Sequence, residues 1–206
     1  MFAVIIPDRG DRPQLLEFAK FQLSRMSTQP DAVYIVDYKP KSAAVDLIPR
    51  IKIGTEKAKS DGFDQVMIVE NDDWYGKDYF DNIGYADFVG SESTTYYNLR
   101  NRTYQDWTHP KRSSLFTTGF KISALEGFEW PPETDTFLDI SLWLYATQKR
   151  KTIHWRETKA IGIKHGIGLC GGKGHVQQNK YMDRELEWLK ANVDSESFDF
   201  YKSIKF

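Results

Sequence analysis

Three acidic side chains follow one short apolar run in this sequence. The run is Val66–Val69, and Glu70, Asp72 and Asp73 come shortly after it. Four consecutive apolar residues, β-branched at both ends, predict a strand that is buried on both faces. Carboxylates gathered at the end of a parallel strand stabilise a fold poorly, but they suit a hard divalent cation, which takes oxygen ligands from protein and phosphate alike. The alternative is a solvated acidic turn, and the spacing by itself favours neither.

The segments before this strand alternate between apolar runs and helical patterns. The β-branched apolar runs predict strands, and Pro13 suits the first turn of a helix whose apolar spacing continues to about Met26. In order, the predicted elements are Phe2–Ile6, Pro13–Met26, Ala32–Val36 and Gly54–Ser60. This β-α-β-α-β order predicts a parallel sheet with right-handed crossovers.

Polar residues follow the first two predicted strands, at the edge where ligands of open parallel sheets bind. Pro7 and Asp8 follow the first strand, and Asp37 follows the second. Arg9 and Arg12 can contact phosphate oxygens, and Asp37 can accept hydrogen bonds from a ribose or a base. A solvated loop explains the two arginines equally well. Neither GxGxxG after the first strand nor GxxxxGK[ST] occurs, which disfavours a Rossmann dehydrogenase and a P-loop enzyme.

The second half of the chain predicts shorter strands, several of them with alternating polarity. They cover residues 86–89, 94–99, 102–107, 114–122, 152–155 and 160–163, with a hairpin turn at 98–101. A nearly all-apolar helix is predicted over 136–147, and it contains one carboxylate, Asp139. A glycine-rich loop follows at 166–174, and an amphipathic helix is predicted over about 183–191.

The composition is that of a globular α/β protein. The 206 residues carry a net charge of −1, which excludes a polycation, and 40% are hydrophobic. The single cysteine, Cys170, excludes an internal disulfide framework and a four-cysteine zinc site, and it fits a reducing cytoplasm. The apolar N-terminal run is too short for a signal peptide, and no window is apolar enough to span a membrane. We therefore expect a cytoplasmic protein.

The order of these parts resembles the glycosyltransferase-A fold, and most of all the inverting family-2 type. The resemblance covers roughly residues 1–175. It implies an α/β fold with a central, mostly parallel, Rossmann-like sheet, helices on both faces and a smaller antiparallel subregion on the acceptor side. It also implies one domain over 1–206, with a nucleotide-binding half (1–75), an acceptor and catalytic half (76–180) and a helical tail (181–206). The motifs that carry it are Val4-Ile5-Ile6-Pro7 with Asp8, the acid Asp37, the helix from Gly54, and Glu70-Asn71-Asp72-Asp73-Trp74.

The last of these motifs resembles the D-x-D signature that binds the metal in this family. Asn71 departs from the pattern, because the family often has Asp there. The resemblance implies Asp73 as the first metal ligand and Asp72 as the second. Several enzymes of this fold add a late histidine, and His165 after the last predicted strand fits that position. The cation would be Mn²⁺ or Mg²⁺, with Mn²⁺ favoured if an imidazole ligates it.

The same resemblance assigns the remaining roles in catalysis and donor binding. Asp139, in Leu138-Asp139-Ile140, would be the general base, because a carboxylate in a partly apolar site has a raised pKa suited to deprotonating a hydroxyl. A structural alternative is an aspartate that stabilises the start of a helix. The donor would be a nucleotide-diphosphate sugar, with a UDP-sugar expected, and transfer would invert the anomeric centre. Its contacts would come from Pro7, Asp8, Arg9, Arg12, Asp37, Gly54, Asn71, Asp72, Thr118 and Gly119.

The acceptor is less closely defined by the sequence. Basic and aromatic residues alternate between positions 96 and 112, which suits a polyanion. The expected acceptor contacts are Trp74, Tyr97, Arg102 and Trp107. A 5-hydroxymethylated pyrimidine in DNA is one candidate, since small phage enzymes of this kind exist, and the protein would then work in the host cytoplasm. A surface glycan or a lipid-linked sugar remains open, as do a nucleotidyltransferase and an inactive nucleotide-sugar-binding module.

Overall fold

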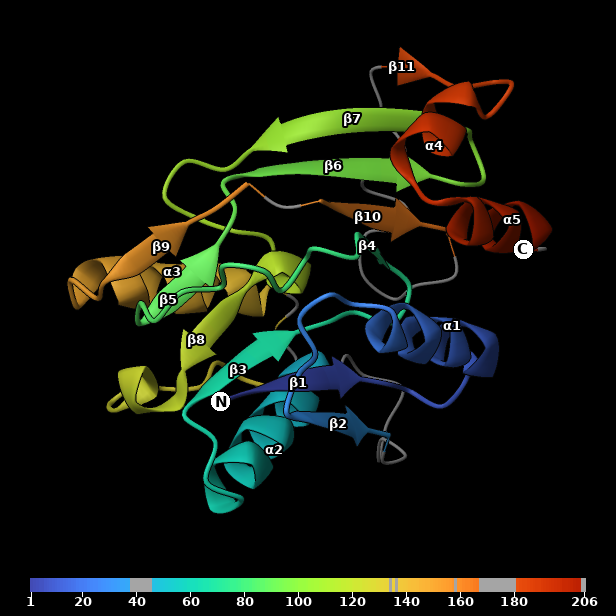
Figure 1. Cartoon of the computed structure of the whole chain (residues 1–206). Coiled ribbons are helices and arrows are strands. Elements are labelled where there is room, and N and C mark those ends of the chain that lie inside the picture. The colour runs from blue at the N-terminus through green and yellow to red at the C-terminus, as the bar shows by residue number, and fades with distance from the viewer. Residues whose placement is uncertain (38–45, 134, 136, 158, 167–180, 205–206) are drawn as a thin grey trace.

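The computed structural model describes residues 1–37, 46–133, 135, 137–157, 159–166 and 181–204. Within these residues the strands form two sheets (Figure 1). The larger sheet has the order β2 (Ala32–Val36), β1 (Phe2–Pro7), β3 (Gln65–Ile68), β8 (Gly119–Lys121), β5 (Phe88–Gly90) and β9 (Ile153–Trp155). The smaller sheet has the order β11 (Tyr181–Met182), β7 (Thr103–Thr108), β6 (Ser93–Asn98), β10 (Ala160–Lys164) and β4 (Trp74–Tyr75).

The N-terminal half of the larger sheet is parallel, as the alternation of strands and helices predicted. β1 pairs in parallel with β2 and with β3, and β5 pairs in parallel with β9. β8 is antiparallel to both of its neighbours, β3 and β5. The smaller sheet is mostly antiparallel, with β10 and β6 as its parallel pair. The sequence-based fold class, an α/β protein with a second antiparallel region, is therefore confirmed.

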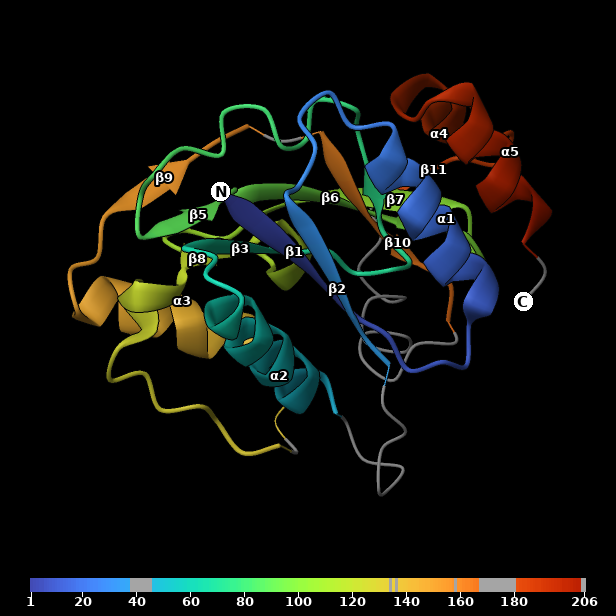
Figure 2. The same ribbon diagram turned by 60° about the horizontal axis from the view of Figure 1, so that its bottom comes forward.

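Helices cover both faces of the larger sheet (Figure 2). On one face α2 (Leu47–Ser60) and α3 (Leu138–Gln148) pack through a core that contains Ile5, Ile51 and Leu142. The other face packs against α1 (Pro13–Ser24) and residues of the β4 region. This burial of both faces explains why the strands read as unbroken apolar runs. No helix of the described ranges combines the length and apolarity needed to cross a membrane.

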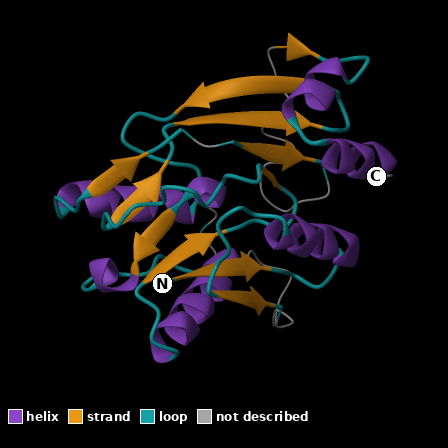
Figure 3. Ribbon diagram, in the orientation of Figure 1, coloured by secondary structure: helices purple, strands orange, loops and turns teal. Residues whose placement is uncertain are grey.

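Two helices end the described chain, and the second of them lies beside α1 (Figure 3). They are α4 (Glu187–Asn192) and α5 (Ser195–Ser203). Phe200 of α5 stacks on Phe18 of α1, with ring centroids 3.7 Å apart and planes inclined by 10°. These contacts close a third apolar cluster, which also includes the end of β10.

The structure corrects several predicted boundaries. The segment 114–122 is a strand only at β8, between the short 3₁₀ helices Leu115–Thr117 and Ile122–Leu125. The carbonyl of Ser114 accepts hydrogen bonds from the hydroxyls of Thr117 and Thr118, which closes a tight turn in place of a strand. The helix predicted from residue 54 begins at Leu47, and the single helix predicted over 183–191 is replaced by α4 and α5. Most of the glycine-rich loop at 166–174 lies outside the described residues.

Gly54 lets α2 lie close to the central strand, and this contact gives a stability prediction. A Cβ atom at Gly54 would lie 2.6 Å from Cγ2 of Ile5, which is fully buried in β1. We expect Gly54→Ala to lower the free energy of unfolding by about 1–3 kcal/mol, because overpacking outweighs the gain in helix propensity. Urea denaturation measures this change, with Lys52→Ala on the exposed face of the same helix as the control. Unchanged or increased stability would contradict the packing role.

Candidate functional site

The acidic cluster lies in the turn between β3 and β4, at the carboxyl end of β3. Glu70, Asp72 and Asp73 each offer a carboxylate oxygen, and these oxygens lie within 4.8 Å of one another. Asp73 is fully buried, and its Oδ1 accepts a hydrogen bond of 2.7 Å from the backbone N–H of Ile163. Its Oδ2 is buried without a hydrogen-bond partner among the described residues. Such an oxygen is costly in an apolar surrounding, and a bound cation would satisfy it.

Strand pairing brings the end of β10 to this cluster. β10 runs antiparallel to β4, with Ile161 opposite Trp74, so the residues after Ile163 reach the acidic turn. His165 is buried, and its Nε2 lies 2.9 Å from Oδ2 of Asp72 and 3.1 Å from Nη1 of Arg12. Arg12 also contacts the same carboxylate oxygen at 3.2 Å. The carboxylate of Asp72 is thus held between Arg12, which precedes α1, and His165, which follows β10.

Side chains from α1 and α5 fix the backbone of the acidic turn. Gln22 donates a hydrogen bond of 3.0 Å to the carbonyl of Asp73 and accepts one of 2.9 Å from the N–H of Tyr75. The buried Tyr201 donates to the carbonyl of Asp72 at 3.4 Å. Because these bonds go to the backbone, they set the position of the turn without using its carboxylates.

Burial and neighbouring charges divide the acidic side chains into two kinds. Burial, with nearby carboxylates, raises the pKa of Glu70 to about 7 and holds the pKa of Asp73 well above its ordinary value. Burial acts in the same direction on Asp72, but the hydrogen bond with His165 and the charge of Arg12 outweigh it and lower the pKa of Asp72 strongly. Asp72 is therefore held in its ionised form, and a bound divalent cation would favour the ionised forms of Glu70 and Asp73 as well.

Lys164 is the positive charge that most affects Glu70 and Asp73. Burial acts to lower the pKa of Lys164, but the carboxylates of Asp73, Glu70 and Asp72 outweigh that effect and raise it. Its ammonium group lies 5.1 Å from the ring centroid of Tyr96. An ammonium group at this position is suited to contact the oxygens of a diphosphate.

The loops after β1 and β2 adjoin the acidic turn. Asp8 is buried, and its carboxylate accepts hydrogen bonds from the amide of Asn71 at 2.5 Å and from the N–H of Gly10 at 3.0 Å. The backbone N–H of Asp8 bonds to the carbonyl of Val36 at 3.0 Å, so the exposed Asp37 lies next to it. Asn71, the departure from the D-x-D pattern, is therefore an amide donor to Asp8. Pro7 ends β1 in the sheet.

Asp139 lies in the first turn of α3, close enough to Glu70 to raise the pKa of that carboxylate. Its own carboxylate is ion-paired with Arg112, whose Nη2 lies 2.8 Å from Nδ1 of His109. His109 in turn stacks on Trp107, with planes inclined by 12°. Burial raises the pKa of Asp139, and Arg112 only partly offsets this effect. Trp107, an expected acceptor contact, is therefore linked to the candidate base through two side chains.

Three residues expected to touch the donor are engaged in packing. Gly54 contacts Ile5 in the core, as described above. Thr118 is fully buried, and its hydroxyl bonds to the carbonyl of Ser114 and to the indole of Trp143. At Gly119 a Cβ atom would lie 2.1 Å from the sulfur of Met67. In this structure these residues support the sheet under the site.

Three expected acceptor contacts hold the C-terminal helices. Trp74 is 6% exposed, and its indole N–H donates to Asp194 and Ser197 at 3.1 Å. Tyr97 is fully buried and donates to Asp183 at 2.9 Å. Arg102 is exposed and donates to the carbonyl of Arg184 at 2.8 Å. The two aromatic rings would have to leave this packing to stack on a sugar.

Some residues of the site were not recognised from the sequence. Glu70 was seen in the acidic run but was not assigned as a ligand, and Arg12 was assigned to the donor alone. Arg112 is part of the basic and aromatic stretch between positions 96 and 112, and the sequence patterns assign no role to Lys164 or Gln22. Their roles depend on contacts between distant residues, such as the 51 positions that separate Gln22 from Asp73. The position of Lys164 directly before His165 was the one local signal available.

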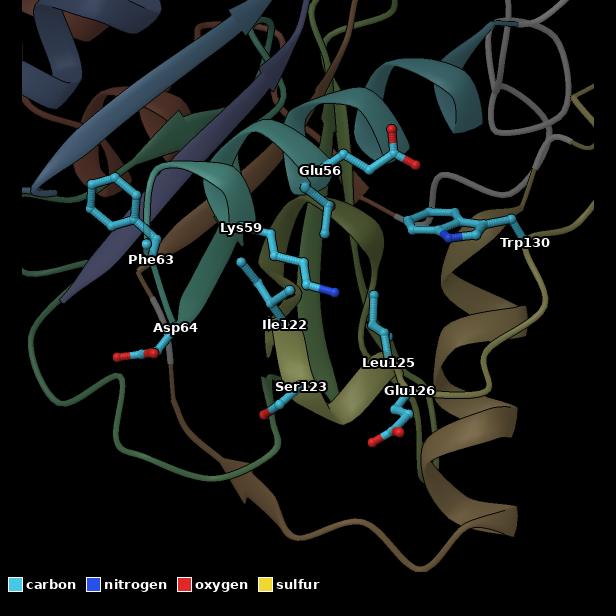
Figure 4. A pocket seen from close by; sticks show the side chains of 11 residues that line it. Glu56, Lys59, Phe63, Asp64, Ile122, Ser123, Leu125, Glu126 and Trp130 are labelled. Atoms are coloured by element: carbon cyan, nitrogen blue, oxygen red, sulfur yellow. The ribbon is translucent and has the colours of Figure 1, made fainter.

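A separate pocket of about 650 Å³ opens between the C-terminal half of α2 and the 3₁₀ helix 122–125 (Figure 4). Its lining includes Lys59, Phe63, Asp64 and Trp130. Phe63 and Asp64 precede β3, whereas the acidic cluster follows it, so the pocket lies at the other end of the strand. None of the predicted site residues lines it.

No family model and no curated protein matches this sequence. Solved structures do resemble it. S. aureus TarS in complex with UDP-GlcNAc superposes with a TM-score of 0.54 at 13% identity, over 80% of this chain and 58% of that one. TarS in complex with UDP gives 0.51 at 12% identity, over 79% and 60%. A197 from STIV gives 0.47 at 15% identity, over 76% and 81%.

These similarities establish the fold. The similarity to the TarS structures shows that this chain has an α/β fold of the glycosyltransferase-A type, with the two sheets described above. At such low sequence identity it shows the fold alone. This chain spans less than two thirds of those TarS structures. The acidic turn after β3 groups three carboxylates, as expected for the D-x-D-like metal site of this fold.

Proposed function

We propose that this protein is a metal-dependent glycosyltransferase that moves a sugar from a nucleotide-diphosphate donor to a hydroxyl group. The observation that carries the proposal is the buried, unpartnered Oδ2 of Asp73 beside Glu70 and Asp72, in a fold of the glycosyltransferase-A type. A UDP-sugar is the proposed donor, which the TarS complexes with UDP and UDP-GlcNAc support.

The residues present fit a divalent cation. Glu70, Asp72 and Asp73 would hold it, and His165 is a further candidate ligand if it releases Asp72. When bound, Mn²⁺ or Mg²⁺ supplies positive charge to the leaving diphosphate. Without a cation, the ionised carboxylates of this cluster would repel that diphosphate.

The chain's own side chains then bind and orient the donor. Arg12 and Lys164 are the cations nearest the acidic turn and would contact phosphate oxygens. Arg9 is half-buried in the same loop and ion-paired with Asp11. Asp37, exposed at the end of β2, would accept hydrogen bonds from the ribose or the base.

Asp139 would accept the proton of the attacking hydroxyl. Its raised pKa brings the carboxylate closer to the working pH, where a general base is most effective. Direct attack by a hydroxyl on the anomeric carbon opposite the leaving diphosphate inverts that centre. The proposed acceptor is a 5-hydroxymethylated pyrimidine in DNA or a glycan. Trp107, which is linked to Asp139 through His109 and Arg112, is the proposed aromatic contact.

A panel of nucleotide sugars tests the donor and the metal together. We expect release of nucleoside diphosphate from one UDP-sugar in the presence of Mn²⁺ or Mg²⁺, and loss of this activity with a chelator, because the acidic turn needs a cation to accept the diphosphate. Release is measured with hydroxymethylcytosine DNA, with simple glycans and with water alone as acceptors.

Other outcomes of this panel would reject the proposal. Exchange of pyrophosphate would identify a nucleotidyltransferase. Binding of nucleotide sugar without release or exchange, over the whole panel, would identify a binding module. Full activity after complete removal of divalent cations would reject the metal role while leaving the transfer reaction in place.

A further inference from the structure

Arg112 connects the candidate base to His109 and Trp107 at the protein surface. Its Nη1 is ion-paired with the carboxylate of Asp139, and its Nη2 lies 2.8 Å from Nδ1 of His109. The side chain of Asp139 is only 10% exposed, whereas that of Arg112 is 29% exposed. The Arg112 side chain therefore contacts the buried base and is itself still partly open to solvent.

The local backbone keeps this arrangement in place. The N–H of Arg112 donates to the carbonyl of His109 at 3.0 Å, which closes a turn in which Lys111 has φ of 62°. The imidazole of His109 stacks on the indole of Trp107, with ring centroids 6.1 Å apart. The planar fork of an arginine that is held in this way is suited to bind the oxygens of a phosphate group.

We propose that Arg112, with His109 and Trp107, forms a subsite for a phosphate group on the acceptor, and that a phosphate bound there weakens the hold of Arg112 on Asp139. The base is then released when the acceptor is seated. The second part rests on the proposed function, because it takes Asp139 as the base. Phosphate binding at Arg112 and His109 does not depend on that function, whereas the assignment of the phosphate to an acceptor does.

The charges around Asp139 explain why this coupling would matter. Burial raises the pKa of Asp139, while Arg112 and the backbone N–H groups at the start of α3 lower it. A phosphate that neutralises Arg112 removes part of the lowering effect, so the carboxylate becomes a stronger base. Without an acceptor, the ion pair keeps the base occupied and limits the attack of water on the donor.

The four histidines of the chain offer a direct test of the subsite. Imidazole resonances are followed by NMR while inorganic phosphate, and separately dimethyl phosphate, is added to the full chain without metal or donor. We expect a saturable shift at His109 and none at His154, which bonds to the carbonyl of Asn82 outside the site. The probe with the lower dissociation constant shows whether the subsite prefers an unesterified phosphate or a diester.

Substitution of Arg112 tests whether the NMR shift of His109 comes from phosphate bound to this arginine. Arg112→Gln should raise the dissociation constant at His109 by at least about tenfold, the loss expected for a charge-assisted contact. Arg150→Gln, an exposed arginine beyond the end of α3, should leave it unchanged. A silent His109, a shift confined to His165, or an equal response in Arg112→Gln would overturn the subsite.

Donor hydrolysis separates the subsite from the base. Dimethyl phosphate should increase release of nucleoside diphosphate in water severalfold in the natural chain, and Arg112→Gln should be faster without it and insensitive to it. Phosphate binding at His109 with no effect on hydrolysis would overturn the release of the base. A chain with no donor turnover at all would reject the proposed function, and the NMR result would still decide the subsite.

Discussion

Asp73→Asn is expected to lower sugar transfer by about a thousandfold while the protein stays folded. A metal ion contributes several kcal/mol to charge stabilisation, and each 1.36 kcal/mol is worth a factor of ten in rate. Asparagine keeps the oxygen that accepts from Ile163, but it replaces the unpartnered Oδ2 with a neutral amide. The measurements are steady-state release of nucleoside diphosphate and the rise in melting temperature on addition of Mn²⁺. That rise should disappear, since a ligand stabilises only a fold that binds it.

The stability of Asp73→Asn without metal shows whether a loss of activity in this variant comes from unfolding. Burial raises the pKa of Asp73 in the fold, so the folded state binds more protons than the unfolded one, and an ionised Asp73 destabilises the metal-free protein at neutral pH. Asp73→Asn should therefore be at least as stable as the natural chain without metal. Asp78→Asn, an exposed partner of Lys159, is the matched variant and should keep full activity. Near-natural transfer by Asp73→Asn would reject the metal role.

Asp139→Asn is expected to retain donor binding and to lose transfer by a factor of about 10²–10⁴, the usual contribution of a general base. Asparagine has nearly the same shape but cannot take a proton. The two effects are measured separately, by calorimetric titration with the UDP-sugar and by rates at saturating donor. Asp199→Asn, an exposed aspartate of α5, is the control and should match the natural chain in both. Transfer at the natural rate would remove Asp139 as the base.

The pH dependence of transfer gives the same assignment independently. Burial raises the pKa of Asp139 above its ordinary value of about 4, with Arg112 opposing it. Only the deprotonated form accepts a proton, so the rate should fall on the acid side with a midpoint above that ordinary value. This acid limb should be missing from the residual activity of Asp139→Asn. An unchanged limb in the variant would assign it to another group.

Local patterns predicted the parts of the fold that form from neighbouring residues. The buried runs of β1, β2 and β3 are unbroken because both faces of the sheet are covered, and their parallel pairing places the acidic turn beside Asp8. The start of α2 was missed because Pro49 lies near it. In the structure Pro49 falls in the first turn of the helix, where a missing N–H costs nothing.

Long-range contacts explain most of what the sequence did not reveal. An aromatic residue next to an acidic motif is typical of sugar stacking, yet Trp74 bonds to Ser197, 123 positions away. Arg112 and Asp139 are 27 positions apart, and nothing in either local pattern indicates that they pair. Composition shows that such residues are available, but only the tertiary arrangement decides which ones face the ligand and which ones face the core.

The contacts of α5 have a consequence for synthesis of the protein. Tyr201 reaches the carbonyl of Asp72 across 129 positions, and Asp194 and Ser197 hold the indole of Trp74. A ribosome makes these residues long after the turn that they hold, and domains fold as units once their residues are available. A nascent chain that has not yet reached residue 201 therefore lacks part of the framework of its acidic turn, so catalytic competence would arise late in translation.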